Sequence, residues 1–275
     1  MNKSKNLIKK PNLREILSKL KMLSDPQRAK DLQRFFKTGP GEYGEGDVFL
    51  GLRVPEIRKL AKEYQALSLS TLVQMLRSPI HEARLLALLI MVRAYKEGDA
   101  ALKGRIYRTY LKNTRFINSW DLVDLSAEHI IGAHLSCLSH DPLKALAASD
   151  LIWDRRIAIM ATFHFIKKGE FSETLYIAKL LLQDPEDLIH KAVGWMLREV
   201  GKREQKIEES FLKTHYKTMP RTMLRYAIEK FPENLRQRYL KGKTIINKMK
   251  RSGQGSEAAK KTWIGTGSHS QKPDI

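Results

Sequence analysis

A tryptophan and three carboxylates lie close together in "SWDLVDLSAEH", residues 119–129. Trp120 and Asp124 are four residues apart and therefore share one face of a helix. A fixed carboxylate can stabilise developing positive charge or activate water, and a tryptophan face attracts cations. Asp121 and Glu128 have simpler interpretations: a carboxylate in the first helical turn and a local ion pair with an arginine. Trp120 and Asp124 are thus the first candidates for catalytic residues. The alternative is that Asp124 is a solvated surface acid.

A second combination of aromatic and charged side chains lies further along the chain. Trp195 and Arg198 are three residues apart, so they also share a helix face. Arg155 and Arg156 begin the segment between the two tryptophans. A single tryptophan is most simply explained by core packing, but two of them beside charges favour a binding surface.

The charge of the chain indicates what such a surface would bind. The 275 residues include 50 Lys or Arg and 30 Asp or Glu, a formal net charge of +20. This excess favours a polyanionic partner, most commonly nucleic acid. Residues 1–11 and 242–275 are basic tails, and the longer one is rich in Gly, Ser and Lys and is expected to be disordered. The intervening residues 12–241 are also basic, so the charge is not only an effect of the tails.

The elements that position these residues are predicted to be almost all helices. Residues 115–135 resemble one helix capped by Asn118 or Ser119, and the only strand-like stretch lies near residues 47–51. Gly98, Gly169 and Gly201 mark expected helix ends. Helix starts are indicated by proline pairs at Asp25-Pro26, Val54-Pro55, Ser78-Pro79, Asp141-Pro142, Asp184-Pro185, Met219-Pro220 and Phe231-Pro232.

The helical segments repeat with a regular step. Arg84, Ser119, Arg156 and Lys191 are equivalent anchors at intervals of about 35 residues, the length of a short HEAT-like two-helix unit. The predicted fold is therefore an all-α solenoid of HEAT-like repeats with a basic concave face that can hold a duplex. In this register Asp124 replaces an apolar residue of the inward helix, since the equivalent positions are Leu89, Ala161 and Met196.

Other classes of protein are disfavoured by the sequence. Cys137 is the single cysteine and is expected to be a small buried residue. No Cys or His cluster has zinc spacing, and His81, His129, His134 and His190 are expected to be surface or satisfied core residues. The N-terminus lacks the apolar region of a signal peptide, and the apolar run 85–92 is too short to span a bilayer. We therefore expect a soluble protein of a reducing, intracellular compartment.

The glycine-rich stretch "TGPGEYGEGD", residues 38–47, is not a phosphate-binding P-loop. It lacks the GxxxxGK[ST] pattern, and its acidic residues would repel phosphate. It is expected to be a turn with left-handed glycines, the alternative being a hairpin that reaches a DNA groove or branch.

Three motifs carry a resemblance to a known family. The stretches "SWDLVD" (119–124), "WDRRIAI" (153–159) and "HKAVGWMLREVGK" (190–202) resemble the AlkD-type DNA alkylation repair proteins, which are HEAT-like repeat DNA glycosylases. A fourth stretch, "FFKTGPGEYGEGDVFLGLRVPEIRKLAKEY" (35–64), is similar to the N-terminal segment common in that family. The resemblance covers about residues 12–241, and the motifs occur in the family's order at fitting separations.

This resemblance implies an activity and a set of site residues. The family excises purines alkylated at ring nitrogens, such as 7-methylguanine and 3-methyladenine, from duplex DNA without a cofactor or metal. Asp124 matches the catalytic aspartate, and Trp120 and Trp195, with Phe35 as a further candidate, match aromatics that pack on the lesion nucleotide. Arg155, Arg156 and Arg198 match arginines that contact phosphates. We further expect a monomer, as the default oligomeric state, that acts in the cytoplasm and associates with the nucleoid through DNA binding.

One departure from the family pattern keeps an alternative open. The 38–47 loop is longer than the corresponding turn of the best-known active members, and some homologues with an inserted hairpin are thought to bind branched DNA without excising bases. The alternative is therefore a non-catalytic HEAT-like protein that binds branched or damaged DNA. A protein-interaction scaffold is a third possibility, which the net charge disfavours.

Overall fold

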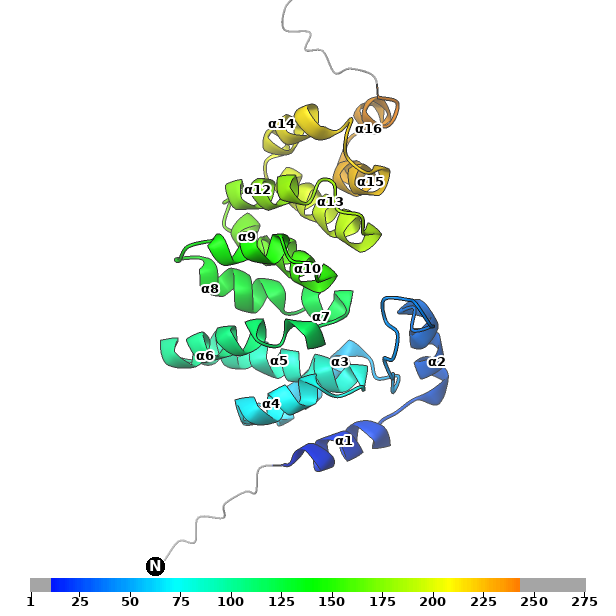
Figure 1. Cartoon of the computed structure of the whole chain (residues 1–275), viewed down its shortest axis with the longest axis vertical. Helices are drawn as coiled ribbons and strands as arrows, with labels where there is room; N and C mark the ends of the chain where they lie inside the picture. The colour runs from blue at the N-terminus through cyan, green and yellow to red at the C-terminus, as the bar shows by residue number, and fades with distance from the viewer. Residues whose placement is uncertain (1–10, 243–275) are drawn as a thin grey trace, which may run out of the picture.

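The computed structural model describes residues 11–242, and these residues are folded almost entirely into helices (Figure 1). The first half contains, in order, α1 (Leu13–Met22), α2 (Pro26–Phe35), α3 (Val54–Glu63), α4 (Leu69–Leu76), α5 (His81–Glu97), α6 (Ala100–Leu111), η1 (Thr114–Phe116), α7 (Trp120–Asp124), η2 (Glu128–Gly132) and α8 (Ala133–Leu135). The second half contains α9 (Asp141–Ala147), α10 (Ile152–Ala161), α11 (Phe163–Lys167), α12 (Ser172–Leu180), α13 (Asp187–Gly201), α14 (Gln205–His215), α15 (Arg221–Ala227), η3 (Ile228–Lys230) and α16 (Glu233–Leu240). The prediction of an all-α fold is confirmed. The basic tails 1–11 and 242–275 fall, except for one residue each, outside the described residues.

The helices begin and end where the local chemistry of the chain predicts. Asp25 caps α2 by accepting a hydrogen bond from the Arg28 amide at 3.0 Å, and Pro26 supplies the first helical residue. Pro220 and Pro232 stand immediately before α15 and α16. Gly98 ends α5, and Gly169 follows α11 with a φ of 80°. Proline or glycine therefore marks several of the helix boundaries, as predicted.

Successive helices stack along the long axis of the molecule in chain order (Figure 1). Helices α5, α7, α10 and α13 form an inner row, and contacts join α5 to α7, α7 to α10, α10 to α13, and α13 to α15. Helices α4, α9, α12 and α14 pack against this row. The four predicted repeat anchors lie in or directly before the inner helices, so the register found in the sequence corresponds to the stack. That these units are HEAT repeats with a basic concave face stays a prediction.

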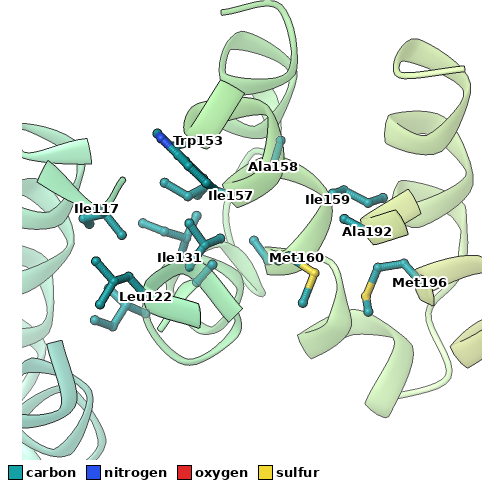
Figure 2. Packing of buried hydrophobic residues seen from close by; sticks show 14 of the residues in the cluster. Ile117, Leu122, Ile131, Trp153, Ile157, Ala158, Ile159, Met160, Ala192 and Met196 are labelled. Atoms are coloured by element: carbon teal, nitrogen blue, oxygen red, sulfur yellow. The ribbon is translucent and has the colours of Figure 1, made fainter. Parts of the chain in front are cut away.

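The core of the stack is a continuous layer of apolar side chains between inner helices (Figure 2). Leu122, Ile131 and Ile157 are fully buried where α7 and η2 meet α10. Met160 of α10 and Met196 of α13 extend this layer, and both are buried. Burial of such side chains contributes about 1.5–3 kcal/mol each, which makes this layer the rigid support of anything placed on the inner helices.

Helix α2 and the 38–47 loop lie beside the stack rather than within it (Figure 1). The segment after the loop is fixed by a parallel bridge between Val48 and Ile80, which is the only strand-like pairing among residues 11–242. Glu82 of α5 accepts hydrogen bonds from the backbone amides of residues 50–52, at 2.8 Å for Gly51. Gly51 has a φ of 86°, and a Cβ there would lie 2.3 Å from the Asp25 carbonyl oxygen. The segment that leads from α2 back to the stack is therefore tightly packed at Gly51.

The segment 115–135 is not the single helix that its apolar spacing predicts. Helix α7 ends at Asp124, a turn follows, and the chain continues as the π-helical segment η2 and the short α8. Ser126 explains the interruption, because its hydroxyl donates to the Leu122 carbonyl at 2.6 Å and also bonds the buried Tyr110 hydroxyl at 2.9 Å. Ser119 occupies the cap position of α7, but its side chain makes no capping hydrogen bond.

No helix within residues 11–242 is both long and apolar enough to cross a membrane.

Candidate functional site

The carboxylate of Asp124 is held by a bidentate ion pair at the end of α7. Arg156 of α10 donates from Nε to Oδ1 at 2.9 Å and from Nη2 to Oδ2 at 2.8 Å. A third donor, Nη1, binds the Leu188 carbonyl at 2.6 Å and so ties the pair to α13. The Asp124 side chain is 12 % exposed and that of Arg156 is 6 % exposed. This geometry fixes the direction in which the carboxylate points.

The pKa of Asp124 is raised above its ordinary value. Burial favours the neutral carboxyl, and the Arg156 guanidinium opposes this effect without cancelling it. Asp121, one turn earlier, adds a smaller upward contribution. The carboxylate thus combines a fixed orientation with a greater affinity for protons than a surface aspartate has.

Aromatic side chains from two regions of the chain gather beside Asp124. The Trp120 ring stacks on Phe36 with centroids 5.1 Å apart, and Phe35 meets it edge-on at 5.9 Å. Phe35 is 64 % exposed although it is large and apolar. Trp195 of α13 is partly exposed and lies near Phe163, with centroids 6.3 Å apart. The structure thus brings Phe35 and Trp120 together as direct neighbours.

Two cavities of similar size meet at these aromatics. An apolar cavity of about 600 Å³ lies between α2, α3, α5 and α7, and a polar cavity of about 580 Å³ extends towards α13 and α15. Phe35, Trp120 and Trp195 line both cavities and form a partition between them. The ion pair straddles this partition, because Asp124 lines the apolar cavity and Arg156 lines the polar one.

The polar cavity contains two lysines and two tyrosine hydroxyls that do not line its neighbour, and two carboxylates lie beside them. Lys37 and Tyr43 come from the chain after α2, and Lys191 and Tyr226 come from α13 and α15. Burial raises the pKa of Tyr43, and the Lys191 ammonium lies close enough to counteract part of that effect. Lys191 is paired with Asp187 at 2.7 Å. This arrangement offers donors to an anion on the Arg156 side of the partition.

A buried network of charges joins α5 to α7 behind the apolar cavity. His81 binds Asp121 through Nε2 at 2.8 Å and Asp47 through Nδ1 at 3.2 Å, and Asp47 also pairs with Arg84. Burial disfavours the His81 imidazolium, but the two carboxylates more than offset this and raise the pKa of His81 to about 8. Burial also opposes ionisation of Asp121, but the hydrogen bond and the charge of His81, with smaller contributions from Ser119 and the Leu122 amide, together lower the pKa of that carboxyl. Asp121 therefore takes part in this charge network and also lies in the first turn of α7.

The predicted phosphate-contacting arginines are all engaged in ion pairs. Arg155 pairs with Asp184 at 2.6 Å and donates to two backbone carbonyls, and it lines neither cavity. Arg198 pairs with Glu229 on the chain after α15. Arg156 uses three of its five N–H donors within the protein, which leaves two. Their roles as phosphate contacts stay predictions, and the geometry adds a positioning role for Arg156.

The 38–47 loop is a series of tight turns. Gly41 and Gly46 have φ values of 75° and 81°, which confirms the prediction of left-handed glycines. Glu42 and Glu45 accept hydrogen bonds from loop amides at 2.9 Å, so the acidic residues stabilise the turns. Tyr43 packs edge-on against Trp153 with centroids 6.0 Å apart, which fixes the loop on α10. No hairpin forms within this stretch of the chain.

Several smaller predictions have clear outcomes. Glu128 forms an ion pair as expected, but the pair is not local: its partner is Lys167 of α11, 39 positions away at 2.6 Å, rather than an arginine. Cys137 is exposed, so the prediction that it is buried is wrong, because it follows α8 on an outer turn. His81 is a satisfied core residue as expected. Within residues 11–242 no cluster of His, Cys, Asp or Glu has the form of a metal site.

Comparison with known proteins identifies the family. Residues 16–231 match the sequence profile of the DNA alkylation repair enzyme family. The chain belongs to this family. The match includes every candidate site residue, so the resemblance inferred from the four sequence motifs is confirmed.

A solved structure supports the fold of this DNA alkylation repair family member. The chain is similar to a structure described as a "predicted DNA alkylation repair enzyme" from Enterococcus faecalis, with a TM-score of 0.59 and 17 % identity. The alignment covers 76 % of this chain and 97 % of that one. A comparison with curated proteins gave no significant match.

The sequence interpretation missed several residues of the site. Phe36 and Lys37 follow Phe35 directly, and the pattern "FFK" at a helix end was a visible signal for both. Tyr43 lies in the glycine-rich loop that the sequence predicts to be a turn or a hairpin, and neither prediction identifies its side chain as part of the site. The pairing of His81 with Asp121 joins residues 40 positions apart, and local sequence carries no signal for it.

Proposed function

We propose that this member of the DNA alkylation repair family is a DNA glycosylase that excises cationic alkylated purines, such as 7-methylguanine and 3-methyladenine, from duplex DNA. The observation that carries the proposal is the Asp124 carboxylate, fixed by Arg156 where two cavities meet at an aromatic partition. Such a carboxylate can stabilise positive charge that develops on a sugar.

The chemistry follows from the charge of the substrate. Alkylation at N7 or N3 makes the purine cationic, so it leaves as a neutral base without a general acid. The C1′–N9 bond breaks, its electron pair goes to the base, and positive charge develops on the deoxyribose. Asp124 stabilises this charge and orients water, which adds to C1′ and passes its proton to the carboxylate and then to solvent. Trp120 and Trp195 attract the cationic sugar and exclude bulk water.

The polar cavity supplies the contacts to the backbone of the DNA. Lys37, Lys191 and the two free N–H groups of Arg156 are directed to a phosphate next to the lesion nucleotide. These contacts set the register of the nucleotide over Asp124 without reading sequence. We therefore expect little sequence preference.

The test is base release from duplex DNA that contains a single 7-methylguanine. Asp124→Asn keeps the size of the side chain and removes its charge, so we expect the rate to fall by roughly 100-fold or more. Glu128→Gln is the matched control, because that carboxylate lies in the same segment but pairs with Lys167 outside both cavities. Its rate is expected to stay close to wild type.

Two results would contradict the proposal. If wild-type protein releases no base but binds junction DNA tightly, the non-catalytic alternative is correct. If Asp124→Asn and wild type release base equally, the reaction does not depend on Asp124.

A further inference from the structure

Two arginines stack on one phenylalanine shortly before α7. The guanidinium carbon of Arg115 lies 4.6 Å from the centroid of the Phe116 ring, and that of Arg77 lies 5.7 Å from it. Phe116 is partly buried and packs against the core, whereas both arginines are exposed. Because an aromatic face attracts a guanidinium, the ring holds in place two side chains that would otherwise move freely.

These two arginines have no counter-charge within the protein. Among residues 11–242 neither forms an ion pair or a side-chain hydrogen bond, so all five N–H donors of each guanidinium are free. In this they differ from Arg155, Arg156 and Arg198, which are engaged in ion pairs. Two like charges held against one ring repel each other, and an anion bound by both would remove that repulsion.

The connections that lead into the inner helices differ in charge along the stack. Residues 77–80 lead into α5 and residues 112–119 into α7, and together they contain three cations and no acid. Residues 148–151 and 181–186, which lead into α10 and α13, contain three acids and no cation. A polyanion is therefore attracted more strongly to the connections into α5 and α7.

The stacked arginines lie within reach of a duplex held at the candidate site. Arg115 precedes Trp120 by five residues, so their Cα atoms are at most about 18 Å apart. This distance corresponds to about five base steps of a duplex. Helix α7, with Asp124, stands between α5 and α13 in the stack, so the connection into α5 and Lys191 of α13 lie on opposite sides of Asp124 (Figure 1).

We propose that Arg77 and Arg115, held by Phe116, form an arginine clamp that binds backbone phosphates of the duplex on the α5 side of the lesion nucleotide. The inference rests on the proposed function for the place of the lesion, whereas the binding of phosphates does not depend on base excision. Together with the lysines of the polar cavity, the clamp holds the DNA backbone on both sides of the nucleotide at Asp124. It contacts phosphates only and reads no sequence.

The first experiment measures the binding of unmodified duplex DNA by the full-length protein at several salt concentrations. We expect Arg77→Gln and Arg115→Gln each to reduce the slope of log affinity against log salt by about 0.9. Arg105→Gln is the matched control, because Arg105 is an exposed arginine of α6, a helix on the side of the stack away from α2 (Figure 1). An unchanged slope in either clamp variant, or the same change in Arg105→Gln, would overturn the clamp.

Phe116→Leu tests the ring, because it keeps both charges and an apolar side chain against the core. We expect its affinity for the duplex to be roughly 2- to 10-fold weaker than wild type, since both guanidinium groups lose the aromatic face that holds them. The salt slope should stay close to that of wild type. Wild-type affinity in this variant would overturn the role of the ring.

Base release from a duplex with a single 7-methylguanine separates the clamp from the proposed reaction. We expect the two arginine variants to need roughly 3- to 10-fold more DNA for the half-maximal rate and to keep the wild-type rate at saturating DNA, because the clamp does not touch the reacting atoms. If wild type releases base and the variants keep the wild-type salt slope, the proposed function stands and the clamp is wrong. If the variants lose slope but wild type releases no base, the clamp stands and the proposed chemistry is wrong.

Discussion

Asp124 and Arg156 depend on each other because both are almost fully buried. Their side chains are 12 % and 6 % exposed, so either charge alone would lie unpaired in a poorly solvated site. Removing one member of a buried pair is costly, at about 3–5 kcal/mol, because the other charge loses its compensation. Arg156 therefore controls the protonation of Asp124 as well as its direction.

This dependence predicts a pH effect on base release. The reaction needs ionised Asp124, whose pKa is raised by burial, so the rate should fall as pH drops through that raised pKa. Arg156→Gln removes the group that lowers this pKa, and the acidic limb of the rate profile should move to higher pH. Arg155→Gln also removes a buried arginine ion pair, with Asp184, and should leave the position of the limb unchanged. The measurement is single-turnover base release across pH, and an unmoved limb in Arg156→Gln would show that Asp124 is not the titrating group.

Part of this site could be predicted from the residues alone. Trp120 and Asp124 share a face because of their spacing, and the repeat register identified Asp124 as an acid at an apolar position. The pairing of Asp124 with Arg156 could not be predicted, because it joins positions 32 residues apart whose side chains meet only through the stacking of α7 on α10. For the same reason Arg156 was interpreted as a phosphate contact without its structural partner.

At the scale of elements, α7 is short and ends at Asp124, the residue that lines the apolar cavity. An apolar pattern at helical spacing continues through residues 115–135, so the sequence predicts one helix there. The Ser126 hydroxyl, which donates to the Leu122 carbonyl and also bonds the Tyr110 hydroxyl, lies where α7 ends, and these two bonds cannot be inferred from periodicity. The π-helical segment that follows is of a kind often found near functional sites.

The close contact between α13 and α15 predicts that a larger residue at position 194 will destabilise the protein. A Cβ at Gly194 would lie 2.4 Å from the Met223 carbonyl oxygen and 2.6 Å from Tyr226 Cβ. Gly194→Ala should therefore force the helices apart and lower the free energy of unfolding by about 1–3 kcal/mol. Gly104→Ala, within α6, meets only the end of the flexible Arg108 side chain and should stabilise by about 0.5–1 kcal/mol. Urea unfolding measures both, and equal effects would contradict the close approach.

The network that joins α5 to α7 makes a prediction about pH and stability. The pKa of His81 is raised from 6.5 to about 8, so the folded state binds this proton more tightly than the unfolded state. The resulting stabilisation is fully present below pH 6.5 and is lost as pH rises through 8. The shift corresponds to about 2 kcal/mol in the free energy of unfolding.

His81→Gln supplies the comparison for this effect. The amide can bond one of the two carboxylates but cannot titrate, so the variant should be less stable than wild type at acidic pH. The difference between the two proteins should shrink as pH rises, because wild type loses its proton. Urea unfolding over this range measures the difference, and a constant difference would show that His81 does not carry the linkage.

At the scale of the whole molecule, the site lies where two parts of the chain meet. Helix α2 and the loop after it contribute Phe35, Lys37 and Tyr43, and the stacked helices contribute Trp120 and Trp195. The net charge predicted a polyanionic partner but not which cations face it. The fold engages the predicted arginines in ion pairs and places two lysines at the polar cavity, and we propose that these lysines face the DNA.

The two lysines of the polar cavity predict how strongly the affinity for DNA depends on salt. Lys37 is exposed and has a φ of 51°, a left-handed conformation that asparagine tolerates better than most residues, so Lys37→Asn removes the charge without backbone strain. If Lys37 and Lys191 each neutralise a phosphate, Lys37→Asn and Lys191→Gln should each reduce the slope of log affinity against log salt by about 0.9. Lys179→Gln, on the exposed side of α12, should leave the slope unchanged. Titrations of duplex DNA at several salt concentrations measure these slopes. Each of the three variants removes one positive charge and so alters the long-range electrostatic field equally. An equal change of slope in all three would therefore show that the phosphate contacts lie outside the polar cavity.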